Sequence, residues 1–317
     1  MKLYDSDYQL PRLAKHIRSQ CPGCTDHNLT VIYQEAYASD GIQSYLKRQY
    51  QGKASHTADD WEYALAKCNN CQLVFQKNVP SESFLKEIYD LWVPHTDIEH
   101  ENHQLQEYEY LSSQIQFLIR HFRLPPRQLR MLDFGCGWCP WTKMAMGYGC
   151  NVVGVEVSES RINYAKSIGV EVLDLEALPP KSFQFINTEQ VFEHLVDPQL
   201  ILKQLTACLT SDGLIKISVP DSRPALEKLR KVEDFSLLSP NLQMSVAPLE
   251  HINSFTHDSL VAMAASVGLQ TVRPRLGHLY NSASGLFSPK ELVRTLVRPF
   301  YRHVYPCSTF IYFGLAQ

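Results

Sequence analysis

The chain has 317 residues, of which 44% are hydrophobic, and its formal net charge is −3. This length allows one or two domains with a sizeable core, and no run reaches the ~18 apolar residues that a membrane span requires. Lys and Arg are spread along the chain. Nucleic-acid binding is therefore disfavoured, because it usually requires a basic surface.

The beginning of the sequence is too acidic and too polar for a secretory signal. Nine cysteines are an odd count, and without an export signal they predict reduced thiols in a cytoplasmic protein. We find no internal repeat and no low-complexity segment. The oligomeric state is left open.

Two C-x-x-C pairs lie near the N-terminus, at Cys21 and Cys24 and at Cys68 and Cys71. Each pair suits a tight turn with both thiolates directed at one ion, and two pairs complete the tetrahedral shell of a structural Zn²⁺ site. The alternatives are unpaired core cysteines or a redox pair, but two pairs in one short segment favour a single metal ion. We therefore predict a small zinc-ribbon-like module over residues 1–80.

A helical connector is expected over residues 81–128. Within it, the aromatic and histidine residues Tyr89, Trp92 and His95 are expected to cover a ligand of the following domain. The spacing of apolar residues predicts a helix over 107–122, which ends before a pair of prolines.

After the connector, the sequence predicts a strand, a glycine turn, a helix and a second strand. Apolar residues over 129–132 predict a buried strand that leads into Asp133, Gly135 and Gly137. The glycines allow a sharp turn and close approach of a ligand. A second apolar strand over 152–157 contains Glu156, which can accept hydrogen bonds from both ribose hydroxyls.

This arrangement is typical of a nucleoside-binding half-fold, and two cofactors are candidates. A dinucleotide requires a third glycine and a helix N-terminus directed at the pyrophosphate, but Cys139 and Pro140 follow the turn here. Asp133 also places a negative charge where a diphosphate would lie. A carboxylate suits instead S-adenosylmethionine (SAM), whose methionine end carries an amino group beside the sulfonium.

The turn resembles the first motif, D-x-G-x-G-x-G, of the class I SAM-dependent methyltransferases. Cys139 replaces the third glycine, and a non-glycine residue suits that position if its φ is below zero. Further along, residues 188–198 resemble the "vlEHl-dp" segment of this family, and residues 249–255 resemble a "Hln-ft" segment common in one of its branches. The resemblance covers residues 100–317.

The remaining strands are predicted over 170–174, 182–187, 214–220 and 308–314, with a turn at 211–213 before the third of these. Alternating strands and helices predict an α/β fold with a doubly wound, mostly parallel sheet. The resemblance implies seven strands, the last one antiparallel, in a Rossmann-like methyltransferase domain over 129–317. The long connection over 221–254 is interpreted as a lid over the substrate.

Ligands of such sheets bind at the carboxyl ends of the strands. We expect Glu156 to bind the ribose, and the resemblance implies that Asp174 contacts the adenine amino group. Cys136 and Cys139 are interpreted as lining the cofactor loop. The full set of predicted cofactor-binding residues is Asp133, Gly135, Cys136, Gly137, Glu156, Val157, Asp174, Leu175, Thr188 and Glu189.

Methyl transfer needs a base only when the acceptor carries a proton to be removed. His194 and His251 are the candidate catalytic bases. The alternative is that His194 is a packing residue of a common family segment. Glu193 is a candidate for orienting an imidazole.

The predicted acceptor is a small molecule such as a sugar, a nucleotide-sugar or a secondary metabolite, methylated on oxygen or carbon. The segment Asn187-Thr-Glu-Gln190 differs from the Asn/Asp-Pro-Pro-Tyr segment typical of nucleic-acid amine methyltransferases. Two alternatives remain: an RNA or protein methyltransferase that grips its substrate with the zinc module, and a non-enzymatic binding protein. Intact Asp133, Glu156 and Asp174 argue against the second alternative.

Overall fold

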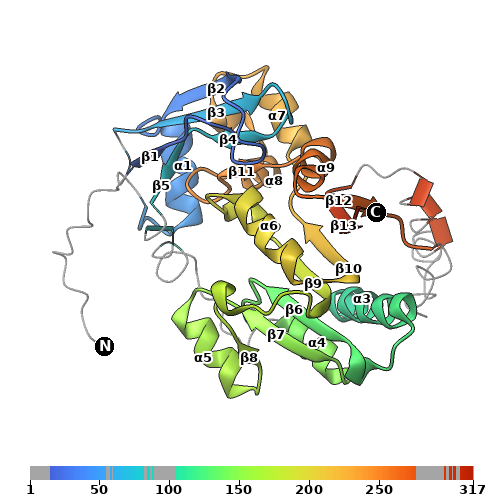
Figure 1. The fold of residues 1–317 in the computed structure, drawn as a ribbon. Coiled ribbons are helices and arrows are strands. Elements are labelled where there is room, and N and C mark those ends of the chain that lie inside the picture. The colour runs from blue at the N-terminus through green and yellow to red at the C-terminus, as the bar shows by residue number, and fades with distance from the viewer. Residues whose placement is uncertain are drawn as a thin grey trace, which may run out of the picture.

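The computed structural model describes residues 15–54, 58, 60–81, 84–85, 88, 105–275, 296–297, 300–301, 303–304 and 308–316. Tyr89, Trp92 and His95 lie outside the described residues. Figure 1 shows a large sheet with its helices and, at the other end of the molecule, a smaller sheet built from the N-terminal strands. In the part of the chain that is described, no helix combines the length and apolarity needed to cross a membrane.

The large sheet has seven strands in the order β12-β13-β10-β9-β6-β7-β8. All neighbouring pairs are parallel except those of β13, which runs antiparallel to both β10 and β12. This confirms the predicted fold and the antiparallel last strand. The strands are β6 (Arg130–Phe134), β7 (Asn151–Val155), β8 (Glu171–Val172), β9 (Phe183–Glu189), β10 (Leu209–Ser218), β12 (Leu269–Val272) and β13 (Phe310–Leu315).

One predicted boundary was wrong. The Ser211–Gly213 segment was expected as a turn before a strand that begins at Leu214. Instead β10 begins at Leu209 and its register against β9 shifts between Leu209 and Leu214. The small residues therefore form an irregularity within the strand, as glycine in a strand interior often does.

Helices cover both faces of the large sheet. Phe185 and Ile186 are consecutive in β9, so their side chains point to opposite faces. Phe185 packs in a cluster with residues of α3 (Leu105–Phe122) and α4 (Pro140–Gly147). Ile186 packs in another with residues of α6 (Pro198–Cys208) and α9 (His257–Ser266). Helix α5 (Glu159–Ser167) follows β7.

Several helices begin with a proline, which has no N–H to leave unpaired and has its φ fixed near the helical value. Each of these prolines stands at the first or second position of its helix. They are Pro140 in α4, Pro198 in α6, Pro224 in α7 (Arg223–Leu229) and Pro240 in α8 (Pro240–Ser245).

The smaller sheet has the strand order β11-β4-β3-β2 and is antiparallel throughout. Its strands are β2 (Leu29–Ala36), β3 (Glu62–Cys68), β4 (Val74–Gln76) and β11 (Asn253–Ser254), and helix α1 (Asp40–Gln49) lies between β2 and β3 in sequence. Strands β1 (Lys15–Ile17) and β5 (Asn78–Pro80) form a separate antiparallel pair.

The segment 221–254 packs against the N-terminal module. It contains α7, η5 (Phe235–Leu237), α8 and β11, and Figure 1 shows α7 at the same end of the molecule as β2 and β3. Phe235 lies in a cluster with Tyr45 and Tyr63, with ring centroids 5.5 and 5.6 Å from theirs. The insertion and the N-terminal strands thus share one hydrophobic core. The domain boundaries and the lid role stay predictions.

Candidate functional site

The glycine turn lies between β6 and α4, at the carboxyl end of the central strands. Gly135 has a φ of +73°, and a Cβ added there would lie 2.5 Å from Cγ2 of Val191. Gly137 has a φ of +53°, and its added Cβ would meet no atom of a described residue within 4 Å. Gly135 is therefore required for packing, whereas Gly137 exposes its backbone to open space that a ligand can enter.

Cys139 does not follow the expectation of a negative φ. Its φ is +61° and it precedes α4 as the N-cap residue. The left-handed conformation that the third glycine would adopt is thus kept by a cysteine, at a cost of about 1–2 kcal/mol. Its N–H donates to the Cys136 carbonyl at 2.8 Å, which closes the turn. Both cysteines are buried.

Asp133, the first residue of the motif, is buried, and both of its oxygens have partners. Thr142 Oγ1 donates to Oδ2 at 2.6 Å and Asn187 Nδ2 donates to Oδ1 at 2.7 Å. Burial raises the pKa of Asp133, and the two hydrogen bonds oppose that rise. The carboxylate therefore links the glycine turn to β9. Neither Thr142 nor Asn187 could be identified as its partner from sequence spacing.

Glu156 follows β7 and accepts three backbone hydrogen bonds. Gly137 N donates to Oε2 at 2.9 Å, while Val157 N and Ser158 N donate to Oε1 at 2.8 and 3.0 Å. One carboxylate thus joins the glycine turn to the start of α5. The predicted ribose contact stays a prediction.

The other predicted cofactor residues lie along the same strand ends. Val157 is 62% exposed, and Asp174 is an exposed residue that begins η3 (Leu175–Ala177). Leu175 is half-buried. Thr188 is fully buried and its Oγ1 donates to the Lys216 carbonyl at 2.9 Å, so its side chain is engaged within the sheet.

Glu189, at the end of β9, belongs to a buried polar network that sequence reasoning missed. Lys216 is completely buried, pairs with Glu189, and donates to Gln114 Oε1 at 2.7 Å. Tyr110 donates to Glu189 at 2.8 Å from α3. Burial lowers the pKa of Lys216, and Glu189 opposes that shift. A lysine in an apolar strand was the only signal for this network.

The two predicted bases lie together. His194, in η4 (Phe192–His194), and His251 have ring centroids 4.8 Å apart. Nδ1 of His194 lies 2.9 Å from the Glu250 carbonyl. A carbonyl only accepts, so Nδ1 carries the proton and Nε2 is left with its lone pair. Burial lowers the pKa of His194 to about 4 and that of His251 to about 3.

Glu193 lies in the same cluster. Its Oε1 is 3.9 Å from Nε2 of His194. Neither of its oxygens, nor Nδ1 of His251, has a hydrogen-bond partner from another of the described residues. Burial raises the pKa of Glu193 to about 8. At neutral pH the cluster therefore holds two neutral imidazoles and a carboxyl group that is mostly protonated, which is a poor orienting group.

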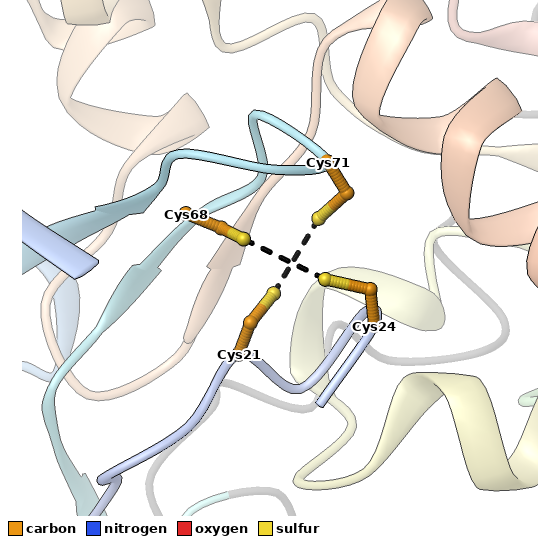
Figure 2. A group of neighbouring side chains, drawn as sticks. All are labelled: Cys21, Cys24, Cys68 and Cys71. Carbon is orange, nitrogen blue, oxygen red and sulfur yellow. Dashed lines mark hydrogen bonds between the residues drawn. The ribbon is translucent and has the colours of Figure 1, made fainter. Parts of the chain in front are cut away.

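The four N-terminal cysteines converge although Cys24 and Cys68 are far apart in sequence. Figure 2 shows their sulfurs directed at a common centre. Cys21 Sγ lies 3.5 Å from Cys71 Sγ, Cys24 Sγ lies 3.5 Å from Cys68 Sγ, and all four are free thiols within 4.8 Å of one another. A tetrahedral shell with Zn–S bonds of about 2.3 Å has sulfur–sulfur edges of about 3.8 Å. The donor set and its size fit Zn²⁺.

Comparison with known proteins identifies related sequences. The profile of a family described as a methyltransferase domain matches residues 102–273. A ubiquinone biosynthesis O-methyltransferase of Bradyrhizobium diazoefficiens is 32% identical over 99 residues, covering 28% of this chain and 39% of the relative. One from Coxiella burnetii is 28% identical over 120 residues, covering 35% and 47%. The matches thus span less than half the length of these relatives.

Solved structures give a looser likeness. The plantazolicin methyltransferase BpumL in complex with SAH is 14% identical, with a TM-score of 0.44 over 74% of this chain and 94% of that chain. A SAM-dependent methyltransferase from Archaeoglobus fulgidus is 16% identical, with a TM-score of 0.35 over 65% and 92%.

Proposed function

This chain belongs to the class I SAM-dependent methyltransferase family, and on that premise we propose that it transfers a methyl group from SAM to a small-molecule acceptor, on oxygen or carbon. Two features of the structure support this best. One is the open glycine turn tied to Glu156. The other is the buried pair of neutral histidines.

The residues proposed to hold SAM are those predicted at the strand ends. Gly137 offers its backbone to the ligand, and Glu156 can exchange a backbone partner for ribose hydroxyls. Asp133 and Glu189 supply negative charge for the methionine end, and Asp174 lies where the adenine is expected. Cys136, Gly135, Val157, Leu175 and Thr188 complete the surroundings.

SAM supplies an already activated methyl group, so the protein contributes alignment, exclusion of water and removal of a proton. We propose that Nε2 of His194 accepts the proton of the acceptor, because Nδ1 is held by the Glu250 carbonyl. His251 packs edge-on against it and is the second candidate. An acceptor whose proton is lost in solution would need neither base.

We further propose that the four cysteines bind one structural Zn²⁺. A thiolate shell without an open position is typical of zinc sites that stabilise a fold. Such a site requires reduced thiols, which supports a cytoplasmic protein.

The first experiment is calorimetric titration with SAM, SAH and NAD. We expect SAM and SAH to bind and NAD not to bind. Glu156→Ala should weaken SAM binding by about 1.5–3 kcal/mol, as expected for hydrogen bonds to a charged group. The matched control is Glu159→Ala, an exposed acid three residues away in the first turn of α5. Tight NAD binding without SAM binding would contradict the proposal.

The second experiment identifies the acceptor class. Labelled SAM is incubated with the protein and either metabolite pools or total RNA and protein. Label in low-molecular-weight products supports the proposal. Label in RNA or protein, with binding that weakens as salt rises, would favour the polymer-directed alternative.

A further inference from the structure

Arg18 is a buried cation placed between the N-terminal module and the histidine pair. It is 4% exposed. Its Nη1 donates to the Ile252 carbonyl and to Asn253 Oδ1, both at 3.0 Å. Its Nη2 donates to the carbonyls of Leu195 and Val196, at 3.2 and 2.7 Å. One guanidinium thus binds two segments that are more than fifty residues apart in sequence.

Asn253 completes the connection. Its Nδ2 donates to the Phe192 carbonyl at 3.0 Å and to the Leu195 carbonyl at 2.7 Å. Arg18 and Asn253, which we call the clasp, therefore hold the chain on both sides of His194, at Phe192 in η4 and at the residues that follow η4. They also hold the residues that directly follow His251. His194 thus lies between two points that the clasp fixes, and His251 directly precedes a third.

The clasp is anchored in the N-terminal module rather than in the large sheet. Arg18 N donates to the Lys77 carbonyl at 2.9 Å, and the guanidinium lies 5.8 Å from the ring centroid of Phe75. Three residues further on is Cys21, in the turn of the cysteine cluster. The next carbonyl, that of Pro22, accepts a hydrogen bond from Gln199 N at the start of α6.

The partners of Arg18 are suited to positioning. Three of its four acceptors are backbone carbonyls, so a change at Arg18 moves the main chain beside the histidines. The acid that acts on it, Asp197, opposes the effect of burial, which lowers the pKa of Arg18 to about 10. The side chain stays charged at neutral pH, and its planar fork supplies the separate donors that two segments require.

We propose that Arg18 is a positioning residue, which holds His194 and His251 together and away from water and so makes the N-terminal module part of the acceptor half-site. This inference rests on the proposed function for the meaning of the histidine pair. The clasp then positions the residues of the acceptor side, whereas the glycine turn and Glu156 bind SAM.

The test compares Arg18→Met with Arg48→Met in the full chain. Arg48 also joins the N-terminal module to the insertion, through Gln243, but makes no contact with the clasp. The readout is the ring ¹⁵N signals of His194 and His251 at pH 6.0, assigned with His194→Gln and His251→Gln. Both rings should be neutral in the unaltered protein and in Arg48→Met.

In Arg18→Met we expect one or both rings to become hydrated and to titrate near the ordinary pKa of ~6.5, hence to be about three-quarters protonated at pH 6.0. SAH affinity, measured by calorimetry with SAH itself, should change by less than about twofold, because no clasp residue contacts the cofactor half-site. A loss of stability alone would lower the melting temperature without changing the rings.

Arg18→Lys and Asn253→Ala carry the test if Arg18→Met does not fold. Lysine keeps the charge but lacks the separate donors of the guanidinium, and alanine lacks the side-chain amide of Asn253. Both variants should therefore also expose the histidine rings to water. Unchanged ring signals in every folded clasp variant would overturn the inference. Failure of the unaltered protein to bind SAH would instead contradict the proposed function. The ring signals would still show whether the clasp keeps the two histidines away from water.

Discussion

At the scale of single residues, the proposed acceptor side depends on the burial of two histidines. His194 and His251 have depressed pKa values because their rings are removed from water, and His194 has its tautomer set by the Glu250 carbonyl. A histidine that stays neutral throughout the physiological range is always able to accept a proton, although its basicity is reduced.

His194→Gln is expected to leave SAM affinity nearly unchanged and to lower the turnover number by about 10²–10⁴. If the acceptor can ionise alone, higher pH should restore part of the loss. In the unaltered protein, activity should begin to fall only as pH approaches 4, where His194 becomes protonated. Single-turnover methyl transfer measures this. An unchanged rate would assign the base to His251 or to no residue.

Stability should depend on pH through the same histidine. Its folded pKa of about 4 is below the unfolded value of ~6.5, so the folded state binds fewer protons. The contribution of this histidine to the unfolding free energy is therefore fully present above pH 6.5. It is lost as pH falls toward 4, by an amount on the order of 3 kcal/mol. Glu193 has the opposite sign: with a folded pKa of about 8, its contribution declines as pH rises from about 4.5 to 8.

We therefore expect His194→Gln to reduce the loss of unfolding free energy between pH 7 and pH 4.5, measured by urea denaturation. His16→Gln, at an exposed position in β1, is the control and should leave the slope unchanged. Parallel pH profiles for His194→Gln and the unaltered protein would contradict the burial of the ring.

At the scale of elements, the turn between β6 and α4 is the most constrained segment of the cofactor half-site. Three of its residues, Gly135, Gly137 and Cys139, have positive φ, and of the two glycines only Gly135 would clash with a described residue if given a side chain. The turn is also bound from outside, by Glu156 on Gly137 and by Val155, whose carbonyl accepts from Gly135 N at 2.8 Å.

Gly135→Ala should destabilise the protein by about 1–3 kcal/mol, because its φ is positive and the new Cβ would meet the Val191 side chain. The resulting shift of the turn should weaken SAM binding as well. Gly147→Ala is the matched control: it lies in α4, with no atom of a described residue within 4 Å of its added Cβ, and alanine suits a helix better than glycine. Equal effects of the two changes would argue against a tightly packed turn.

At the scale of the whole molecule, the cysteine cluster packs into one core of the large sheet rather than into the tyrosine-rich core of the N-terminal strands. Cys21, Cys68 and Cys71 pack in the same cluster as residues of the large sheet, whereas the tyrosine-rich core of the N-terminal strands includes the insertion. The face of the large sheet under α3 and α4 has a separate core. Metal binding is expected to stabilise the N-terminal strands and the insertion, because Cys68 ends β3 and β11 of the insertion pairs with β4. The separate core under α3 and α4 is expected to keep the large sheet folded without the metal.

Purified, reduced protein should contain one equivalent of Zn²⁺. A strong chelator, or Cys68→Ser, should increase hydrogen exchange in the N-terminal strands and in 221–254 while the large sheet stays protected, since binding free energy acts there as folding free energy. Cys208→Ser, at a buried cysteine of α6 outside the cluster, is the control. Less than about half an equivalent of zinc, with all four thiols reactive, would reject the site.

The sequence by itself determined the class of fold, because alternating apolar strands and helices specify a doubly wound sheet and the order of acids and glycines marks its ligand edge. It also determined the cysteine cluster, since two C-x-x-C turns already hold each pair of thiols close. Local chemistry carries these signals: strand periodicity, glycine at a turn, and ligand spacing all act over a few residues.

Only the tertiary structure decided the rest, because those contacts join residues without a fixed spacing in sequence. The positive φ of Cys139, the network of Lys216 and Glu189, and the sharing of one core by the insertion and the N-terminal strands follow from packing. The same holds for Arg18, which nothing in the sequence distinguishes from an exposed cation. Its burial follows from the carbonyls of Leu195 and Val196, just after η4, which accept their hydrogen bonds from this distant donor.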